Sequence, residues 1–205
     1  MDIMKMINKA KDIILKPKDT IDKLKNETVT IKDIIIYLII IGLPTFLGIF
    51  LGYGFVGWGF YSGWIGFAFA LALITYILSI VGIIVFGFIL NKLATNFKSK
   101  ENKMQAMKLV SYAATPWLLL GIASIYPPIA IISLLGGIYG LYILYIGIPI
   151  LMETPKEQQM TYFIIGLVIY IVIIGIIYWL IGWIWWQLVW SSYWGWGTYG
   201  YYWHP

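Results

Sequence analysis

Residues 34–91 of this 205-residue chain read IIIYLIIIGLPTFLGIFLGYGFVGWGFYSGWIGFAFALALITYILSIVGIIVFGFILN and contain no charged side chain. A helix needs about 20 apolar residues to cross a hydrocarbon core of about 30 Å, so this stretch has room for two crossings. Two more charge-free segments follow, at 109–152 and 158–205. The first has room for two crossings and the second for one crossing and a tail. The sequence therefore predicts an all-α polytopic membrane helix bundle with five transmembrane helices.

The composition excludes several classes of protein. Hydrophobic residues make up 61% of the chain and charged residues 11%, whereas a soluble domain carries about 25% charged residues. Lysine supplies all 14 basic side chains, while proteins that read nucleic acids depend heavily on arginine, so no nucleic-acid partner is expected. The absence of cysteine excludes disulfides, thiolate metal sites and a cysteine nucleophile.

The charged residues lie in three segments, 1–33, 92–108 and 153–157, which set the limits of the spans. We expect three regions: a cytoplasmic amphipathic leader at 1–32, a five-span membrane domain at 33–190 and an aromatic outer-side tail at 191–205. The expected spans run from about Asp33 to Gly52, from Trp64 to Leu90, from Ala106 to the Pro127-Pro128 pair, from Ile129 to Met152 and from Gln159 to Trp179.

The lysines predict the orientation of the chain. Eight lie in the leader, five were assigned to the loop after the second span (Lys108 is the last of them), and one lies after the fourth span. Because cytoplasmic loops carry the excess of lysine, the N-terminus is expected in the cytoplasm and the C-terminus outside. We expect an integral membrane protein of a prokaryotic plasma membrane.

The tryptophans favour the same orientation. Ten of the 11 lie near the expected outer surface, and only Trp117 falls inside a span. Tryptophan prefers the membrane–water interface because its ring is apolar and its N–H group needs a partner. The ten form an aromatic belt: Trp58, Trp64, Trp179, Trp183, Trp185, Trp186, Trp190, Trp194, Trp196 and Trp203.

The leader begins with an amphipathic stretch. One helical face is expected to carry apolar residues and the opposite face lysines, a pattern typical of helices that lie in the headgroup region. The expected apolar face consists of Ile3, Ile7, Ala10 and Ile14, with Met6 and Ile13 beside it. Such a helix is either a passive interfacial anchor or a segment that binds a partner or senses the membrane.

Small residues recur at four-residue spacing in three spans. The pairs are Gly48/Gly52 and Gly136/Gly140, and the second span has Ser62, Gly66 and Ala70. This spacing allows helix backbones to approach closely, either within the bundle or between two copies of the chain. Prolines at 44, 116 and 149 are expected to kink their spans.

Tyr139, Tyr142 and Tyr145 recur every three residues along the fourth span. Their hydroxyls, with those of Ser111, Thr115 and Ser133, either line a polar groove for a lipid headgroup or form hydrogen bonds between helices. No ionisable side chain lies in the middle of a span, where coupled transporters place one. We therefore expect no catalytic residues, cofactor or metal.

Three runs resemble the Yip1-domain family of small polytopic membrane proteins, in its prokaryotic form. They are AMKLVSYAATPW at 106–117, IYGLYILYIG at 138–147 and LMETP at 151–155. They match a lysine-led third span entered through a Tyr-Ala-xx-Pro turn, a Gly-Tyr-xx-Tyr fourth span and a Thr-Pro exit. The runs and the glycine pair give the candidate interaction or packing residues Tyr112, Pro116, Gly136, Tyr139, Gly140, Tyr142, Tyr145, Thr154 and Pro155.

The resemblance implies five spans and a cytoplasmic N-terminus. Eukaryotic members act in early secretory-pathway trafficking and bind prenylated small GTPases through long leaders. This leader is short and has no match to the family's Asp-Leu-Tyr-Gly-Pro motif, so binding of a small GTPase is not expected. The resemblance instead implies a role in membrane organisation.

Two functions remain open from the sequence. The first is a non-enzymatic multi-pass protein that organises membrane partners or lipids, as a homo-oligomer or with another membrane protein. The second is an oligomeric transporter or channel for a neutral or lipidic substrate. A water-accessible cavity that reaches the middle of the membrane would favour the transporter, and a dry, tightly packed bundle would favour the first function.

Overall fold

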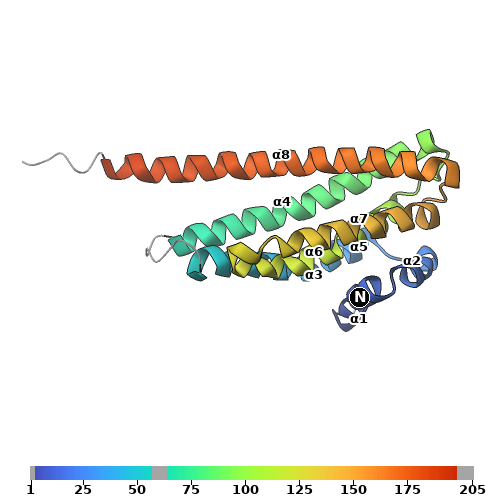
Figure 1. Cartoon of the computed structure of the whole chain (residues 1–205), viewed down its shortest axis with the longest axis horizontal. Helices are drawn as coiled ribbons and strands as arrows, with labels where there is room; N and C mark the ends of the chain where they lie inside the picture. Colours follow the sequence, from blue (N-terminus) through green and yellow to red (C-terminus); the bar gives the residue numbers. More distant parts are fainter. Residues whose placement is uncertain (1–2, 57–63, 198–205) are drawn as a thin grey trace, which may run out of the picture.

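The described part of the chain is helical almost throughout. The computed structural model describes the backbone of residues 3–56 and 64–197, and the side chains of those residues as far as Gln187 apart from Trp64 and Pro127. The α-helices are α1 (Ile3–Leu15), α2 (Pro17–Asn26), α3 (Ile31–Leu51), α4 (Trp64–Leu93), α5 (Lys103–Ala113), α6 (Thr115–Leu120), α7 (Ile132–Leu151) and α8 (Lys156–Gly197) (Figure 1). This arrangement confirms the predicted all-α class.

Five helical segments are long and apolar enough to cross a membrane, as predicted. They are Ile31–Val56, Ile65–Phe97, Lys103–Ile125, Ile132–Leu151 and Lys156–Gln187. The first combines α3 with a π-helical turn at Gly52–Val56, and the third combines α5 and α6 with a 3₁₀ turn at Gly121–Ile125. The spans run side by side, and α8 follows the bundle along its whole length (Figure 1).

The first span begins at a capping box. Asp33 N–H donates to the Thr30 hydroxyl at 3.2 Å, and Thr30 N–H donates to the Asp33 carboxylate at 3.0 Å. These two bonds satisfy backbone donors that a helix start leaves without partners. The spacing of Thr30 and Asp33 in the sequence thus marks where the leader ends and the membrane helix begins.

The third span is interrupted at the proline that the sequence singled out. Helix α5 ends at Ala113 and α6 begins at Thr115, with Pro116 in its first turn. Because proline has no N–H group, it cannot continue the hydrogen-bond ladder of α5. Pro44 and Pro149, in contrast, lie inside the continuous helices α3 and α7.

The glycine pair of the first span packs inside the bundle. A methyl group added at Gly48 would fall on the carbonyl oxygen of Gly121, and one at Gly52 would fall on that of Ser124. The backbones of α3 and the 121–125 turn therefore touch directly, which only small residues permit. In the second span Gly66 has no such neighbour, and Ser62 lies outside the described residues.

The leader is folded against the bundle, and its buried face differs from the predicted one. Met6, Ala10 and Ile13 are buried, whereas Ile3 and Ile7 are about half exposed. The packed stripe is thus shifted by about one position around the helix. Together with residues of α2, these side chains join the same apolar core as the spans. The leader is part of the folded unit.

Helix α8 continues beyond the point where the fifth span was expected to leave the membrane. It has 42 residues and runs to Gly197, well past Trp179. At about 1.5 Å per residue it is about 63 Å long, twice the hydrocarbon thickness. The cause is that no proline follows Pro155 until Pro205. The predicted boundary at 190/191 falls inside this helix, and the tail beyond Gly197 lies outside the described residues.

The tryptophans of the belt are partly described. Trp179, Trp183 and Trp186 are more than half exposed on α8. Trp185 packs against Phe67 at the start of α4, with ring centres 4.5 Å apart. The side chains of the other six lie outside the described residues, namely Trp58, Trp64, Trp190, Trp194, Trp196 and Trp203.

Candidate functional site: the charged junction

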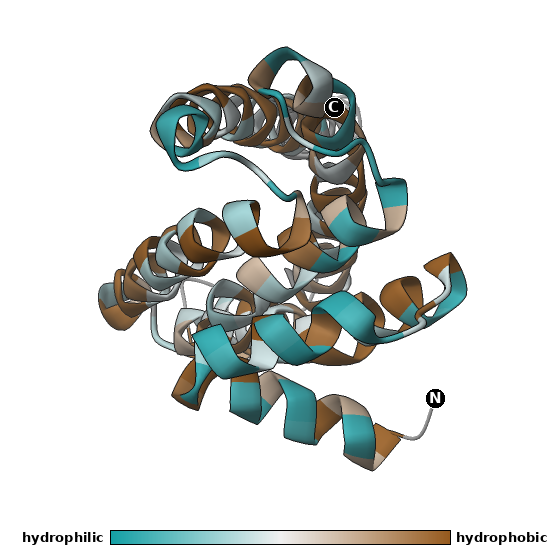
Figure 2. Cartoon of the chain, turned by 90° about the vertical axis from the view of Figure 1, so that its right-hand side faces the viewer, coloured by the Kyte–Doolittle hydropathy of each residue, from teal (hydrophilic) through white to brown (hydrophobic). Residues whose placement is uncertain are grey.

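The three charged segments of the sequence meet at one end of the bundle. One Glu153 carboxylate oxygen lies 3.2 Å from Lys25 Nζ, and the other lies 3.7 Å from Lys100 Nζ. Each of these residues comes from a different charged segment, up to 128 positions apart in the chain. Figure 2 views the molecule from this end, where the hydrophilic ribbon gathers. We call this end the charged junction.

Glu153 holds an unusual backbone conformation between the two lysines. Its φ of 51° lies in the left-handed region, which residues other than glycine rarely adopt. The hydrogen bond from Lys25, followed by the charge of Lys100, holds the pKa of the Glu153 carboxyl below its usual range. The carboxylate is therefore ionised near neutral pH, and the two lysine ammonium groups hold it between them.

Beneath this surface, α5 holds the end of the leader. Lys108 is 2% exposed, and its ammonium donates to the carbonyl oxygens of Leu24 at 2.8 Å and Glu27 at 2.7 Å. Gln105 donates to the carbonyl oxygen of Lys25 at 2.8 Å. A helix ends with carbonyls that have no intrahelical donor and with partial negative charge, so a cation there is doubly favourable. These bonds fix the end of α2 on α5.

A second polar contact joins the two loops of the junction. The Thr154 hydroxyl lies 2.8 Å from that of Ser99, and Lys100 N–H donates to the Met152 carbonyl at 2.8 Å. Thr154 is 5% exposed, so the pair is shielded from water. The carbonyl oxygen of Pro155 accepts from the first turn of α8. Thr154 and Pro155 thus close the loop that leads into the last span.

The hydroxyls of the three tyrosines of α7 have no common partner, although the rings of Tyr139 and Tyr142 touch with centres 5.8 Å apart. The Tyr139 hydroxyl donates to the Ile14 carbonyl at the end of α1, at 2.7 Å. Tyr142 is 49% exposed, and Tyr145 packs on Phe163 of α8 with ring centres 5.3 Å apart. Residues three apart on a helix are rotated by about 60°, which explains the divergence. The three hydroxyls do not form the groove that the sequence left open.

Of the serine and threonine hydroxyls considered with them, those of Ser133 and Thr115 bond between or along helices, whereas the buried Ser111 hydroxyl has no hydrogen-bond partner among the described residues. Ser133 donates to the Leu120 carbonyl at 2.8 Å, and the Thr115 hydroxyl lies 2.7 Å from that of Tyr37. Ser111 is buried and accepts a bond from Thr115 at its carbonyl. These contacts correspond to the alternative of hydrogen bonds between helices.

The remaining candidates surround the α5–α6 break. The ring of Tyr112 is buried against Tyr37, with centres 4.7 Å apart. On α7, a methyl group at Gly136 would lie 2.6 Å from the carbonyl oxygen of Pro116, and one at Gly140 would fall on that of Ala113. The two glycines therefore seat α7 directly on the broken part of the third span.

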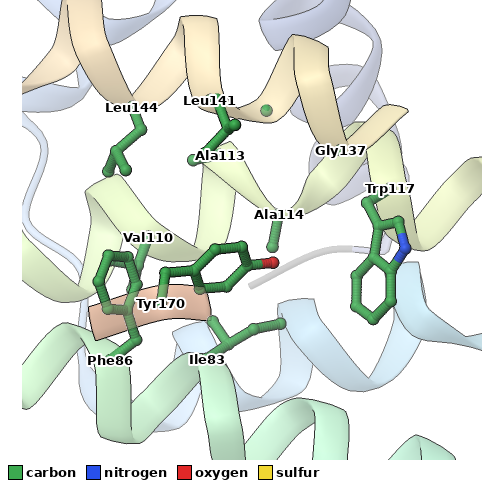
Figure 3. A pocket seen from close by; sticks show the side chains of 11 residues that line it. Ile83, Phe86, Val110, Ala113, Ala114, Trp117, Gly137, Leu141, Leu144 and Tyr170 are labelled. Carbon is green, nitrogen blue, oxygen red and sulfur yellow. The ribbon is translucent and has the colours of Figure 1, made fainter. Parts of the chain in front are cut away.

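A small cavity lies beside this break, between α4, α5, α7 and α8 (Figure 3). Phe86 and Tyr170 pack together at one side, with ring centres 5.1 Å apart, and Trp117 closes another. Its volume is about 30 Å³, and that of a neighbouring cavity that also touches Trp117 is about 30 Å³. Each has room for about one water molecule. The bundle is closely packed at this depth.

The prediction that Lys108 lies in the loop after the second span is wrong. Lys108 lies inside α5 and is buried. The sequence does indicate burial of this lysine, because apolar residues flank it in the run AMKLV at 106–110. Gln105 was not singled out at all. The backbone carbonyls that Lys108 and Gln105 meet lie 80 to 84 residues away in the chain, so only the tertiary structure shows them.

Comparison with known proteins places this architecture among membrane proteins. The model of the Yip1 domain family matches residues 11–180. Two curated relatives, both called inner membrane protein YohC, come from Escherichia coli strains K12 and O6:H1. Each is 30% identical over 122 residues, which cover 55% of this chain and 62% of the relative. The match thus spans less than two thirds of those relatives. No solved structure matches the chain.

Proposed function

The chain belongs to the Yip1 domain family, and from this membership we propose that it is a non-enzymatic multi-pass membrane protein that organises membrane partners or lipids. The observation that carries the proposal is the charged junction. There, Lys25, Lys100 and Glu153 keep side chains 39–62% exposed while their positions are fixed by ion pairs. An exposed, ordered pattern of both charges is suited to selecting a partner by electrostatic complementarity.

The proposed orientation places this junction in the cytoplasm of a bacterium. The leader and the 92–108 segment carry most of the lysines and both lie at the junction, as the positive-inside rule requires of a cytoplasmic face. The opposite end carries the exposed tryptophans of α8. The C-terminus is then outside the cell.

A single introduced cysteine tests this orientation, because the natural chain has none. We expect Lys103→Cys to be protected from an impermeant thiol reagent in intact cells. Ile131→Cys, at a position 72% exposed at the other end, should be labelled. The reverse pattern would overturn the orientation.

Close packing favours partner organisation over solute passage. The two cavities that touch Trp117 beside the helix break hold about 30 Å³ each, too little for a solute larger than water. Larger cavities, of about 510 Å³ between α3, α4 and α8 and about 650 Å³ between α1 and α3, do not touch Trp117. We therefore propose the organising role as the primary one.

Site-specific photocrosslinking in native membranes tests the role. A photoreactive residue at Lys100 should yield one dominant protein adduct, and one at the lipid-facing position Ile171 should yield none. Glu153→Lys, which reverses the central charge, should reduce the adduct at position 100 several-fold. If no adduct forms at Lys100 and the purified protein moves a neutral solute across liposomes, the proposal is wrong.

A further inference from the structure

An apolar groove separates the leader helix α1 from the first span. Figure 2 shows α1 lengthwise next to the N-terminus while the spans are seen end-on, so α1 lies across their direction. The cavity between them has a volume of about 650 Å³. Its apolar walls include Ile7, Ile14 and Leu15 of α1 and Leu43, Pro44 and Leu47 of α3.

This groove needs an apolar occupant. Ile7, Leu15, Leu43 and Leu47 are 43–65% exposed around one opening. The groove is thus a large apolar surface open at one side, and an apolar ligand would cover it. The α3 wall of the groove belongs to a helical segment that is long and apolar enough to cross a membrane, and α1 contacts it. In a bilayer, the apolar ligand available to such a groove is the acyl chain of a lipid.

The groove has one charged lining residue, which indicates the headgroup. Lys11 lies on its α1 wall and is exposed. Within the part of the chain that the structure describes, Lys11 has no ion-pair partner, whereas Lys9 on the same helix pairs with Glu27. A lysine stem runs along apolar surface while its ammonium reaches the headgroup region. There it attracts an anionic phosphate with about 1 kcal/mol.

We propose that the α1–α3 groove is a binding site for an anionic phospholipid. One acyl chain fills the groove between α1 and α3, and the phosphate lies at Lys11 Nζ. The site is separate from the charged junction and does not depend on the partner role proposed for it.

Native mass spectrometry of the delipidated protein tests the site with two lipids of identical chains, phosphatidylglycerol and phosphatidylcholine. We expect phosphatidylglycerol to bind about 5-fold more tightly, the factor that corresponds to about 1 kcal/mol. Lys11→Gln should abolish this preference. The matched control Lys5→Gln removes the same charge from an exposed position of α1 outside the groove and should retain it.

Binding of the lipid acyl chain in the groove is tested separately. Leu43→Trp fills the groove and should weaken binding of both lipids several-fold. A phosphatidylglycerol with a photoreactive group on one acyl chain should label peptides of α1 and α3 in the unmodified protein, which keeps the test valid if the tryptophan variant does not fold.

Three results would overturn the proposal. They are equal binding of both lipids with no effect of Lys11→Gln, photolabelling confined to other helices, and efficient disulfide formation between copies carrying Leu43→Cys. The last result would assign the groove to a second copy of the chain. None of these results would affect crosslinking at the charged junction, so the two proposals fail independently.

Discussion

The third and fifth spans of this bundle are both apolar helices, yet they are held in opposite ways. In the third span, 67% of the most apolar window is buried inside the protein, and in the fifth only 6% is. The third span is short, broken at Pro116 and surrounded by α3, α4 and α7. The fifth is one unbroken helix that touches mainly α4 and α7. Although both spans are apolar, the third packs in the centre of the bundle and the fifth lies on its outside.

Because of this contrast, we expect substitutions in the two spans to change the stability of the folded protein by different amounts. Around the third span, backbone touches backbone and polar groups bond across helices, so substitutions there change the fold. Along α8 most side chains are exposed on the outside of the bundle, so we expect many apolar residues there to be interchangeable. Three pairs of variants and one pH dependence measure the contrast, from the largest expected effect to the smallest.

The largest effect is expected from Gly140→Leu. Its side chain would occupy the position of the Ala113 carbonyl and force α7 away from the helix break. Overpacking of this kind costs about 3 kcal/mol. The same change at Gly175 of α8, where no atom lies within 4 Å, should leave stability within about 0.5 kcal/mol of the original. Thermal unfolding in detergent measures both, and equal losses at the two positions would refute the contrast.

The next effect concerns Lys108→Met, which keeps the stem and removes the ammonium. The carbonyls of Leu24 and Glu27 would lose their donor, at a cost of about 2 kcal/mol to the docking of the leader. Hydrogen exchange of residues 3–26 should increase while the spans stay protected. Lys23→Met is the control, because Lys23 is exposed on the same leader. Unchanged exchange in the Lys108 variant would mean that apolar contacts alone hold the leader.

A smaller effect is expected at the one large side chain of α8 that is fully enclosed among the described residues. Tyr162 is 0% exposed, stacks on Phe97 with ring centres 4.7 Å apart and donates to the Leu90 carbonyl. Tyr162→Phe should lower stability by about 1 kcal/mol. Tyr178→Phe, at a site 59% exposed, should have no measurable effect. If the two variants behave alike, α8 has no protein anchor at the junction.

The smallest effect is a pH dependence at Glu153. Its pKa is lower in the folded protein than in the unfolded chain, because Lys25 and Lys100 favour the carboxylate. The stabilisation is therefore present above the ordinary carboxyl pKa of about 4.3 and is lost as the pH falls through the lower folded value. Exchange of the leader should rise slightly below about pH 4, less so in high salt. In the Glu153→Gln variant, this rise in leader exchange at low pH should be absent.

The sequence predicted the number of spans because that depends on one physical requirement. A segment without charge and of sufficient length enters the membrane, whatever its neighbours are. The interruption at Pro116 was equally readable, since a proline acts on its own backbone. These features are local, and they were predicted in the right places.

The candidate site was harder to predict because its bonds are not local. Lys108 looks like any loop lysine until the end of α2 is folded against it, 84 residues earlier in the chain. The buried face of α1 is displaced from the expected stripe because the bundle, and not helical periodicity, decides which side is covered. The end of α8 was not predicted, because the expected span from Gln159 to Trp179 describes the crossing of the hydrocarbon and the helix itself continues to Gly197.

The distance along the chain between the contacts of the charged junction has a consequence for biosynthesis. The leader leaves the ribosome first, but Lys108 follows Leu24 by 84 residues and Glu153 follows Lys25 by 128. While the first two spans are being inserted, the leader has neither partner and remains available to other factors. A product truncated within the fourth span would keep the leader only partly held. The complete junction can therefore form only after residue 153 has been translated, which follows the fourth span in the chain.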